Sequence, residues 1–225
     1  TIPNTQQQEM ILSTTLPKSS PAFAAHVVHI EGLDLAGKST ATQALLDRHP
    51  GSELRRNALT EGNRPFLLAD ELRRGAGTSA ETLGQLYVAA LRRDIATYEP
   101  PSTETVQDST ILLRSLAFNT VIGATNIADE LWDLLPYHPR FRTSIVLTAS
   151  IEVRLDRLKQ RYRNAPAEVA PDDLMVRDAP ATFLEMESML VETAAAHFDA
   201  SIVDTSDLSR DQVVERILRL DSPLS

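Results

Sequence analysis

The chain has 225 residues, of which 42% are hydrophobic and 24% charged, a composition typical of one soluble globular domain. Its 22 basic and 31 acidic residues give a net charge of -9, which argues against a broad nucleic-acid-binding surface but allows a local anion site. The absence of cysteine excludes disulfides and thiolate centres, and no apolar run reaches the roughly 20 residues of a membrane span. We therefore expect a cytoplasmic protein that binds neither nucleic acid nor membrane.

The opening segment of the chain is polar and lacks the positive cluster and apolar stretch of a signal peptide. We expect residues 1–22 to form a flexible N-terminal extension. No compositional break divides the rest of the chain, so residues 23–225 are expected to form a single domain.

Strand-like and helical segments alternate along this domain. Runs of β-branched residues predict strands, and apolar residues spaced three or four apart predict helices. Residues 164–173, with two prolines and no periodicity, are predicted to be a flexible excursion. The alternation predicts an α/β fold with a parallel sheet, helices on both faces, and ligand-binding loops at one edge. In chain order the expected elements are strand 26–31, helix 41–49, strand 52–57, helices 64–74 and 79–98, strand 103–108, helices 115–123 and 127–135, strand 142–149, helices 151–163 and 182–198, strand 200–205 and helix 209–220.

The loop after the first strand has the spacing of a phosphate-binding loop. Within HVVHIEGLDLAGKST, residues 32–39 match G-x-x-x-x-G-K-[ST]. In this pattern the glycines let amide groups point at phosphate oxygens, the lysine adds a positive charge, and the serine hydroxyl faces magnesium. The alternative is a glycine turn without a ligand, but Lys38 is one of only three lysines in the chain. The residues expected to bind the donor nucleotide are Gly32, Leu35, Ala36, Gly37, Lys38, Ser39 and Thr40.

The longer string HIEGLDLAGKST resembles the loop of the thymidylate kinase family, EG-[LV]-D-x-AGKST. Further segments resemble that family in the same order over residues 24–220. The resemblance implies a P-loop kinase fold with a five-stranded parallel sheet, a mobile helical lid at about 157–178, and a homodimer. It also implies phosphoryl transfer from ATP with Mg²⁺, which depends on positioning and charge neutralisation. The further segments are AETLGQLYVAALRRD, DSTILLRSLAFN, RTSIVLTASIEVRLDRLKQR and ASIVDTSDLSRDQVVERIL.

Leu35 predicts where the catalytic charge comes from. In one branch of the resembled family this loop position is an arginine that reaches the transferred phosphoryl group, whereas in the other branch a lid arginine does so. Because Leu35 carries no charge, we expect the lid to supply it, from Arg161 first and Arg163 second. Arg157 is expected to stack on adenine. The alternative for each arginine is a solvated basic helix face.

The residues expected to bind the acceptor match the family pattern less closely than the phosphate loop does. Asp34 corresponds to a residue near the acceptor's sugar hydroxyl, although an aspartate in a turn also binds nearby amide groups. Arg92 matches the arginine that binds the acceptor phosphate, and Arg56 is a weaker candidate. Val88 stands where the family has a phenylalanine that stacks on the base, with Tyr87 beside it.

A second departure lies at residues 108–110, where Asp-Ser-Thr replaces the D-R-Y of the family. One expected phosphate-binding arginine is therefore absent, and Arg114 is the candidate to replace it. Asp108 is expected to hold the water shell of magnesium, together with Ser39, or to accept the proton of an acceptor hydroxyl. The alternative role for Asp108 is to cap the following helix.

These residues predict an ATP-dependent phosphotransferase of the thymidylate kinase type, acting on a nucleoside monophosphate or a related small molecule. The alternative is a kinase of a free hydroxyl on a nucleoside or a specialised metabolite, which Ser109 favours. A nucleotide-binding module without catalysis is a third possibility. A GTP-dependent switch is not expected, because neither Lys18 nor Lys159 belongs to an N/T-K-x-D motif.

Overall fold

The computed structural model describes residues 21–75 and 77–221, so the N-terminal extension expected at 1–22 lies almost entirely outside the described residues. The five strands are β1 Phe23–Glu31, β2 Glu53–Arg56, β3 Thr105–Asp108, β4 Arg140–Thr148 and β5 Ser201–Asp204. The helices are α2 Lys38–Arg48, α3 Arg64–Arg74, α4 Ala80–Thr97, α5 Ile111–Val121, α6 Thr125–Leu134, α7 Ile151–Asn164, α8 Pro171–Asp178, α9 Pro180–Phe198 and α10 Arg210–Asp221. Two 3-10 turns, η1 Leu135–Tyr137 and η2 Pro166–Glu168, complete the described elements.

The strands form one parallel sheet in the order β2-β3-β1-β4-β5, as the alternating pattern predicts. Strand β1 is central and pairs with β3 on one side and β4 on the other, so the loops after β1 and β3 lie side by side at the carboxyl edge. Hydrogen bonds beyond the strands hold this edge together: Ser109 donates its backbone N–H to Ile30 at 2.8 Å, and Asn57 donates to Asp108 at 3.0 Å.

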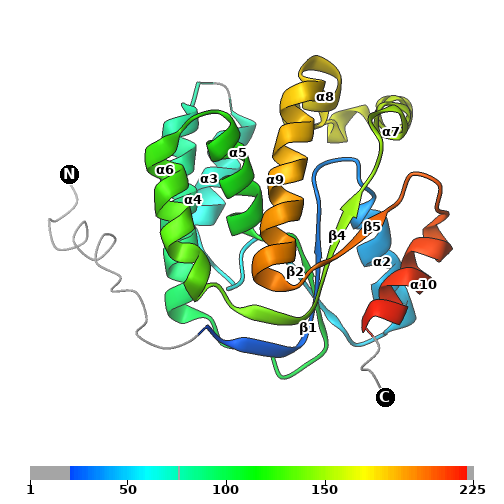
Figure 1. Cartoon of the computed structure of the whole chain (residues 1–225), viewed down its shortest axis with the longest axis horizontal. Helices are drawn as coiled ribbons and strands as arrows, with labels where there is room; N and C mark the ends of the chain where they lie inside the picture. Colours follow the sequence, from blue (N-terminus) through cyan, green and yellow to red (C-terminus); the bar gives the residue numbers. More distant parts are fainter. Residues whose placement is uncertain (1–20, 76, 222–225) are drawn as a thin grey trace, which may run out of the picture.

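Helices cover both faces of the sheet and enclose two cores (Figure 1). Strand β4 shows the alternation, because Ile145 and Leu147 join the apolar cluster beneath α2 and α10. Val146, between them, joins the cluster formed with α4, α5, α6 and α9. Successive side chains of a strand point to opposite faces, which explains why a short apolar run serves both cores. No helix within the described ranges is long and apolar enough to cross a membrane.

Part of the segment expected to be a flexible excursion is helical. Helix α8 begins at Pro171, a residue that suits the first helical turn because its missing N–H has no partner there. Asp173 accepts a hydrogen bond from the backbone N–H of Ala170 at 2.9 Å and so satisfies the start of the helix. The short length of α8, eight residues, explains why the apolar periodicity was too brief to predict it.

A buried carboxylate fixes the loop that follows β2. Asp94, on α4, accepts hydrogen bonds from the backbone N–H groups of Leu59 and Thr60, the hydroxyl of Thr60, and the amide of Asn63. Burial raises the pKa of this carboxyl despite these donors. Four bonds to one side chain hold the loop against α4, which positions Asn57 at the carboxyl edge of the sheet.

His138, just before β4, is enclosed by aromatic rings. Its ring lies 5.8 Å from that of Phe141 and 5.2 Å from that of Phe198, centroid to centroid, with Nδ1 2.9 Å from the carbonyl oxygen of Pro139. Burial lowers the pKa of His138 to about 4. The folded protein therefore keeps this ring neutral at pH values where the unfolded chain would protonate it.

We predict that folding stability falls as the pH is lowered from 6.5 towards 4, with His138 contributing roughly 3 kcal/mol of the loss. The unfolded chain binds the proton and the folded chain does not, so acid favours unfolding in this window. His138→Phe should flatten the dependence of the unfolding free energy on pH, measured by urea denaturation at several pH values. The exposed His49 supplies the control. If His49→Gln flattened the curve as much as His138→Phe, the assignment would be wrong.

Candidate active site

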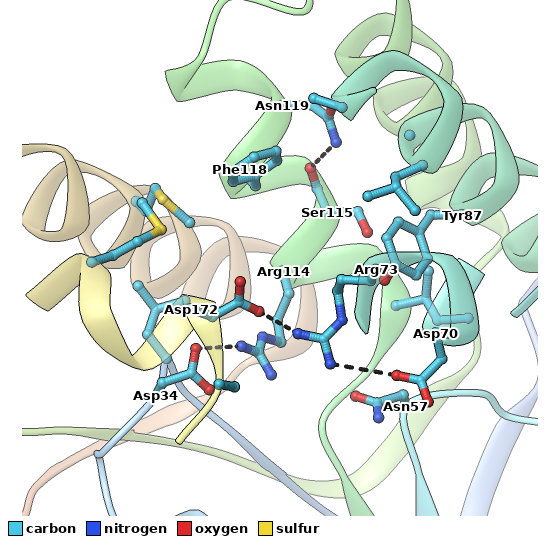
Figure 2. A pocket seen from close by; sticks show the side chains of 18 of the residues that line it. Asp34, Asn57, Asp70, Arg73, Tyr87, Arg114, Ser115, Phe118, Asn119 and Asp172 are labelled. Atoms are coloured by element: carbon cyan, nitrogen blue, oxygen red, sulfur yellow. Dashed lines mark hydrogen bonds and ion pairs between the residues drawn. The ribbon is translucent and has the colours of Figure 1, made fainter. Parts of the chain in front are cut away.

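Two adjoining cavities open at the carboxyl edge of the sheet. The smaller, of about 190 Å³, is called the loop cavity because residues 34–40 form one of its walls. The larger, of about 420 Å³, is called the large cavity and is lined by α3, α4, α5, α8 and α9 (Figure 2). Four residues line both cavities: Asp34, Asn57, Arg114 and Arg161.

The phosphate loop, residues 32–37, has the backbone conformation that its glycines predict. Gly32 has φ +141°, and a Cβ there would lie 2.3 Å from the carbonyl oxygen of Leu147. Gly37 has φ +98°, in the left-handed region that glycine adopts most easily. Leu35 also has positive φ, +64°, which costs free energy for a residue with a branched side chain. Such a conformation is stable only because neighbouring groups hold the loop.

Donors behind the loop satisfy three successive carbonyl groups. Arg154 donates through Nη1 to Asp34 O, and Arg157 donates through Nη1 to Leu35 O at 2.8 Å. The hydroxyl of Thr205 lies 2.9 Å from both Ala36 O and Thr148 O. Arg157 also donates to Thr205 itself. These donors hold the three carbonyl groups on the outer side of the loop, while the backbone N–H of Ala36 donates to Leu33 O at 3.4 Å.

Arg154 lies fully buried between the loop and α9. Besides Asp34 O it binds Ala149 O at 2.8 Å and the carboxylate of Glu187, and its guanidinium lies 4.8 Å from the centroid of the Phe183 ring. Burial lowers the pKa of Arg154 and raises that of Glu187, so water stabilises neither charge and each depends on the other.

The side chain of Leu35 is buried in the apolar cluster that also contains Leu158 and Phe183. It therefore turns away from the loop cavity, and the loop itself presents one side-chain cation, Lys38. The ammonium of Lys38 donates to Leu33 O at 3.0 Å. Burial, and then the charge of Arg114, lower the pKa of Lys38.

Glu31 joins the phosphate loop to the loop after β3. This carboxylate is fully buried and accepts from the backbone N–H of Gly32 at 3.0 Å and of Thr110 at 2.9 Å. Burial alone would raise its pKa, but His29, and after it Lys38, outweigh burial and lower it. Ser109, in the loop after β3, has φ +62°. Its buried hydroxyl has no partner among the described residues.

Asp108 and Ser39 line the loop cavity and fit a magnesium ion. Magnesium in kinase sites takes one or two carboxylate or hydroxyl ligands and completes its shell with phosphate and water. No group of three or more His, Asp or Glu within the described ranges is arranged to hold a metal without such help. Burial raises the pKa of Asp108, offset in part by Lys38. Arg56 lies beside it, with Nε 3.8 Å from Oδ2.

The large cavity has a charged end and a mostly apolar end, at which Ser115 and Asn119 also lie (Figure 2). At the charged end Arg114 donates to Asp34 at 2.8 Å, and Arg73 donates to Asp172 at 2.6 Å while lying 3.4 Å from Asp70. Burial alone would raise the pKa of Asp34, but the charge of Arg114 outweighs it and lowers it. The remaining walls are mostly apolar or aromatic and come from Phe66, Leu83, Tyr87, Phe118, Met175, Phe183 and Met186.

Of the residues predicted to bind the acceptor, four line one or both cavities and one does not. Asp34, Arg56, Arg114 and Tyr87 lie at the two cavities. Arg92 does not line either cavity and instead donates to Glu130 of α6 at 2.9 Å. The reason is helical phase: residues 80, 83, 84 and 87 of α4 face the cavity, and the next residue on that face is 91. Arg92 lies outside this face, and its role in binding an acceptor phosphate stays a prediction.

The three arginines predicted from the lid also occupy different environments. Arg161 lines both cavities, and its Nη1 donates to Asp173 at 2.7 and 2.8 Å. Arg163 is exposed and lines neither cavity. Arg157 binds the outer side of the phosphate loop, so its role in stacking on adenine stays a prediction. Of the three, only Arg161 lines the loop cavity.

Sequence reasoning missed several residues of this site. Glu31 was visible within the motif, but nothing in its spacing indicated a bridge to Thr110. Arg154 lies three residues before Arg157 on one helix face, a signal that could have pointed to the phosphate loop. Nothing in the sequence indicated the ion pair of Arg73, because its partner Asp172 lies 99 residues away.

No model of a known protein family matches the sequence, and no curated protein matches it. Solved structures do match. Thymidylate kinase from Candida albicans gives a TM-score of 0.63 at 16% identity, covering 87% of this chain and 90% of that chain. Deoxyadenosine kinase from M. mycoides with bound dATP gives 0.57 at 17% identity, over 87% and 100%. Thymidylate kinase from Ehrlichia chaffeensis gives 0.55 at 13% identity, over 90% and 100%. The chain has the fold of these P-loop kinases.

We predict that Arg154→Met weakens ATP binding at least about tenfold, because Asp34 O loses its donor and the loop loses its conformation. The single substitution should also destabilise the protein by about 3 to 5 kcal/mol, since Glu187 is left without a partner. ATP titration by calorimetry and urea denaturation measure the two effects.

The double variant Arg154→Met/Glu187→Met separates them. Replacing a buried ion pair by apolar side chains often restores stability. Stability should recover in this variant while ATP affinity stays low, because Asp34 O still lacks a donor. Recovery of ATP affinity together with stability would mean that Arg154 acts on the fold alone.

Proposed function

We propose that the protein is an ATP-dependent phosphotransferase that moves the γ-phosphoryl group of Mg-ATP to a small molecule bound in the large cavity. One observation carries the proposal: the loop cavity and the large cavity adjoin and share Asp34, Asn57, Arg114 and Arg161. A donor phosphate in the first cavity would face an acceptor in the second across these residues. Phosphoryl transfer requires this in-line placement and little covalent chemistry.

The donor side uses the phosphate loop. Amide groups of residues 32–40 and the ammonium of Lys38 would bind the β- and γ-phosphates, aided by the dipole of α2, which begins at Lys38. Ser39 would bind magnesium directly and Asp108 through water, and the ion would neutralise charge on the phosphate oxygens. Because Leu35 supplies no charge, Arg161 is the residue proposed to stabilise the transferred group.

Two kinds of acceptor are consistent with such a site. A nucleoside monophosphate is the class that the thymidylate kinase resemblance implies, and the names of the similar solved structures include both a nucleotide and a nucleoside. A free hydroxyl needs a proton acceptor during transfer. Asp108, whose pKa burial raises, would accept that proton more readily than Asp34, whose carboxylate Arg114 holds ionised.

The test of the proposed function is acceptor-dependent release of ADP, measured in a coupled assay with Mg-ATP over nucleosides and their monophosphates. Lys38→Ala should reduce turnover by about 10²-fold or more by removing the charge on the β- and γ-phosphates. If the purified protein bound ATP but phosphorylated no acceptor, the alternative of a nucleotide-binding module without catalysis would replace this proposal.

We predict that Arg161→Ala lowers turnover by about 10³-fold while changing ATP affinity by less than about threefold. Turnover should fall much more than ATP affinity because the guanidinium neutralises charge that develops only during transfer. Steady-state kinetics and ATP titration on the same preparation measure it.

Arg163→Ala is the matched control, since Arg163 lies two residues away on the same helix and is exposed. It should leave both turnover and ATP affinity near those of the unmodified protein. An Arg161→Ala variant that lost turnover and ATP affinity equally would contradict the assignment of Arg161.

A further inference from the structure

We propose that the acceptor is an uncharged molecule with a flat ring and a hydroxyl-bearing arm, a nucleoside or a close analogue, and not a nucleoside monophosphate. The inference rests on the proposed phosphoryl transfer and specifies its acceptor. The charges at one end of the large cavity carry it, together with the apolar walls at the other end.

The large cavity has no surplus of positive charge for a phosphate group. Among the described residues that line it, three guanidinium groups face four carboxylates. A monophosphate would bring close to two further negative charges into this balance, beside the phosphates of the donor. Like charges placed together cost several kcal/mol, so the lining disfavours that ligand. The charged residues are Arg73, Arg114 and Arg161 with Asp34, Asp70, Asp172 and Asp173.

Each of these guanidinium groups already holds a carboxylate. Arg114 binds Asp34 and Arg161 binds Asp173, as described above. Arg73 lies between two carboxylates and reaches from α3 to Asp172 on α8, across the cavity (Figure 2). The charge of Asp172 raises the pKa of Arg73 above its ordinary value despite burial. A phosphate bound to Arg73 would therefore lie beside two carboxylates, Asp70 and Asp172.

Two further residues that the family resemblance associates with phosphate-binding arginines add no cation to the large cavity. Ser109 is uncharged and lines the loop cavity, where its buried hydroxyl has no partner among the described residues. Arg92 is paired with Glu130 and does not line the large cavity. The positive charge described in the large cavity is therefore that of the three paired guanidinium groups.

The other end of the cavity fits a flat ring. Phe66, Tyr87, Phe118 and Phe183 line it together with Met175 and Met186, and these side chains offer broad apolar surfaces. Gly84 lies on the same wall, where a Cβ would meet the side chain of Ile127 at 2.3 Å. A volume of about 420 Å³ is in the range of small-ligand sites.

A ligand that places its ring among these side chains can extend its arm to the residues shared with the loop cavity. There the hydroxyl oxygen attacks the γ-phosphorus, and the bond from that phosphorus to the β–γ bridging oxygen breaks, so that ADP leaves. The hydroxyl proton passes to water.

Binding of matched ligands to the unmodified protein tests this proposal directly. The probes are the four common deoxynucleosides and their 5′-monophosphates, titrated by calorimetry in the presence of magnesium and a non-hydrolysable ATP analogue. At least one nucleoside should bind on the order of 100-fold more tightly than its own monophosphate. Equal or tighter binding of the monophosphates would overturn the proposal, and so would the absence of binding by any nucleoside.

A charge-removal variant supplies a second measurement. Asp172→Asn removes one of the two carboxylates at Arg73, so affinity for the monophosphate should rise about tenfold while that for the nucleoside changes little. Asp178→Asn is the control, because Asp178 lies on the same helix and pairs with Arg177 at the surface. An unchanged preference in Asp172→Asn would show that the paired carboxylate does not set the acceptor class.

The two proposals fail in different ways. Nucleoside binding without ADP release would leave the ligand class intact and contradict the phosphotransferase. Rapid ADP release with monophosphates alone would establish the phosphotransferase and contradict the uncharged acceptor.

Discussion

A phosphate loop can direct its amide groups inward only if its carbonyl groups find donors on the outside. In this protein Arg154, Arg157 and Thr205 supply donors to three successive carbonyl oxygens, at residues 34, 35 and 36. The rest of the site depends on this arrangement, because a backbone with positive φ at Leu35 has no intrinsic preference for the conformation that binds phosphate. Buried carbonyl groups without donors would make the same loop unstable.

The same contacts join the loop to the helices around it. Arg154, Arg157 and Arg161 recur at helical spacing along α7, so one helix face carries two anchors of the loop and the arginine proposed to act in catalysis. Glu187 continues the connection to α9. A movement of α7 would therefore move Arg161 together with the two anchors of the loop.

Charge is distributed unevenly between the two cavities. In the loop cavity the ammonium of Lys38 donates to a backbone carbonyl oxygen, whereas every guanidinium group described in the large cavity has a carboxylate partner. This division suits a reaction in which the donor is the charged partner and the acceptor enters without a phosphate of its own.

The sequence alone determined the five strands, their parallel arrangement and the phosphate loop, because these follow from local periodicity and from fixed spacing around Gly32, Gly37 and Lys38. It also placed Arg161 and Asp34 at the site through resemblance. Only the tertiary structure decided that Arg92 faces α6 and that Arg73 meets Asp172, since a shift of one helical residue turns a side chain by about 100°. Ion pairs between residues far apart in the chain leave no periodic signal. The proposal of an uncharged acceptor rests on such pairs, which only the folded protein brings together.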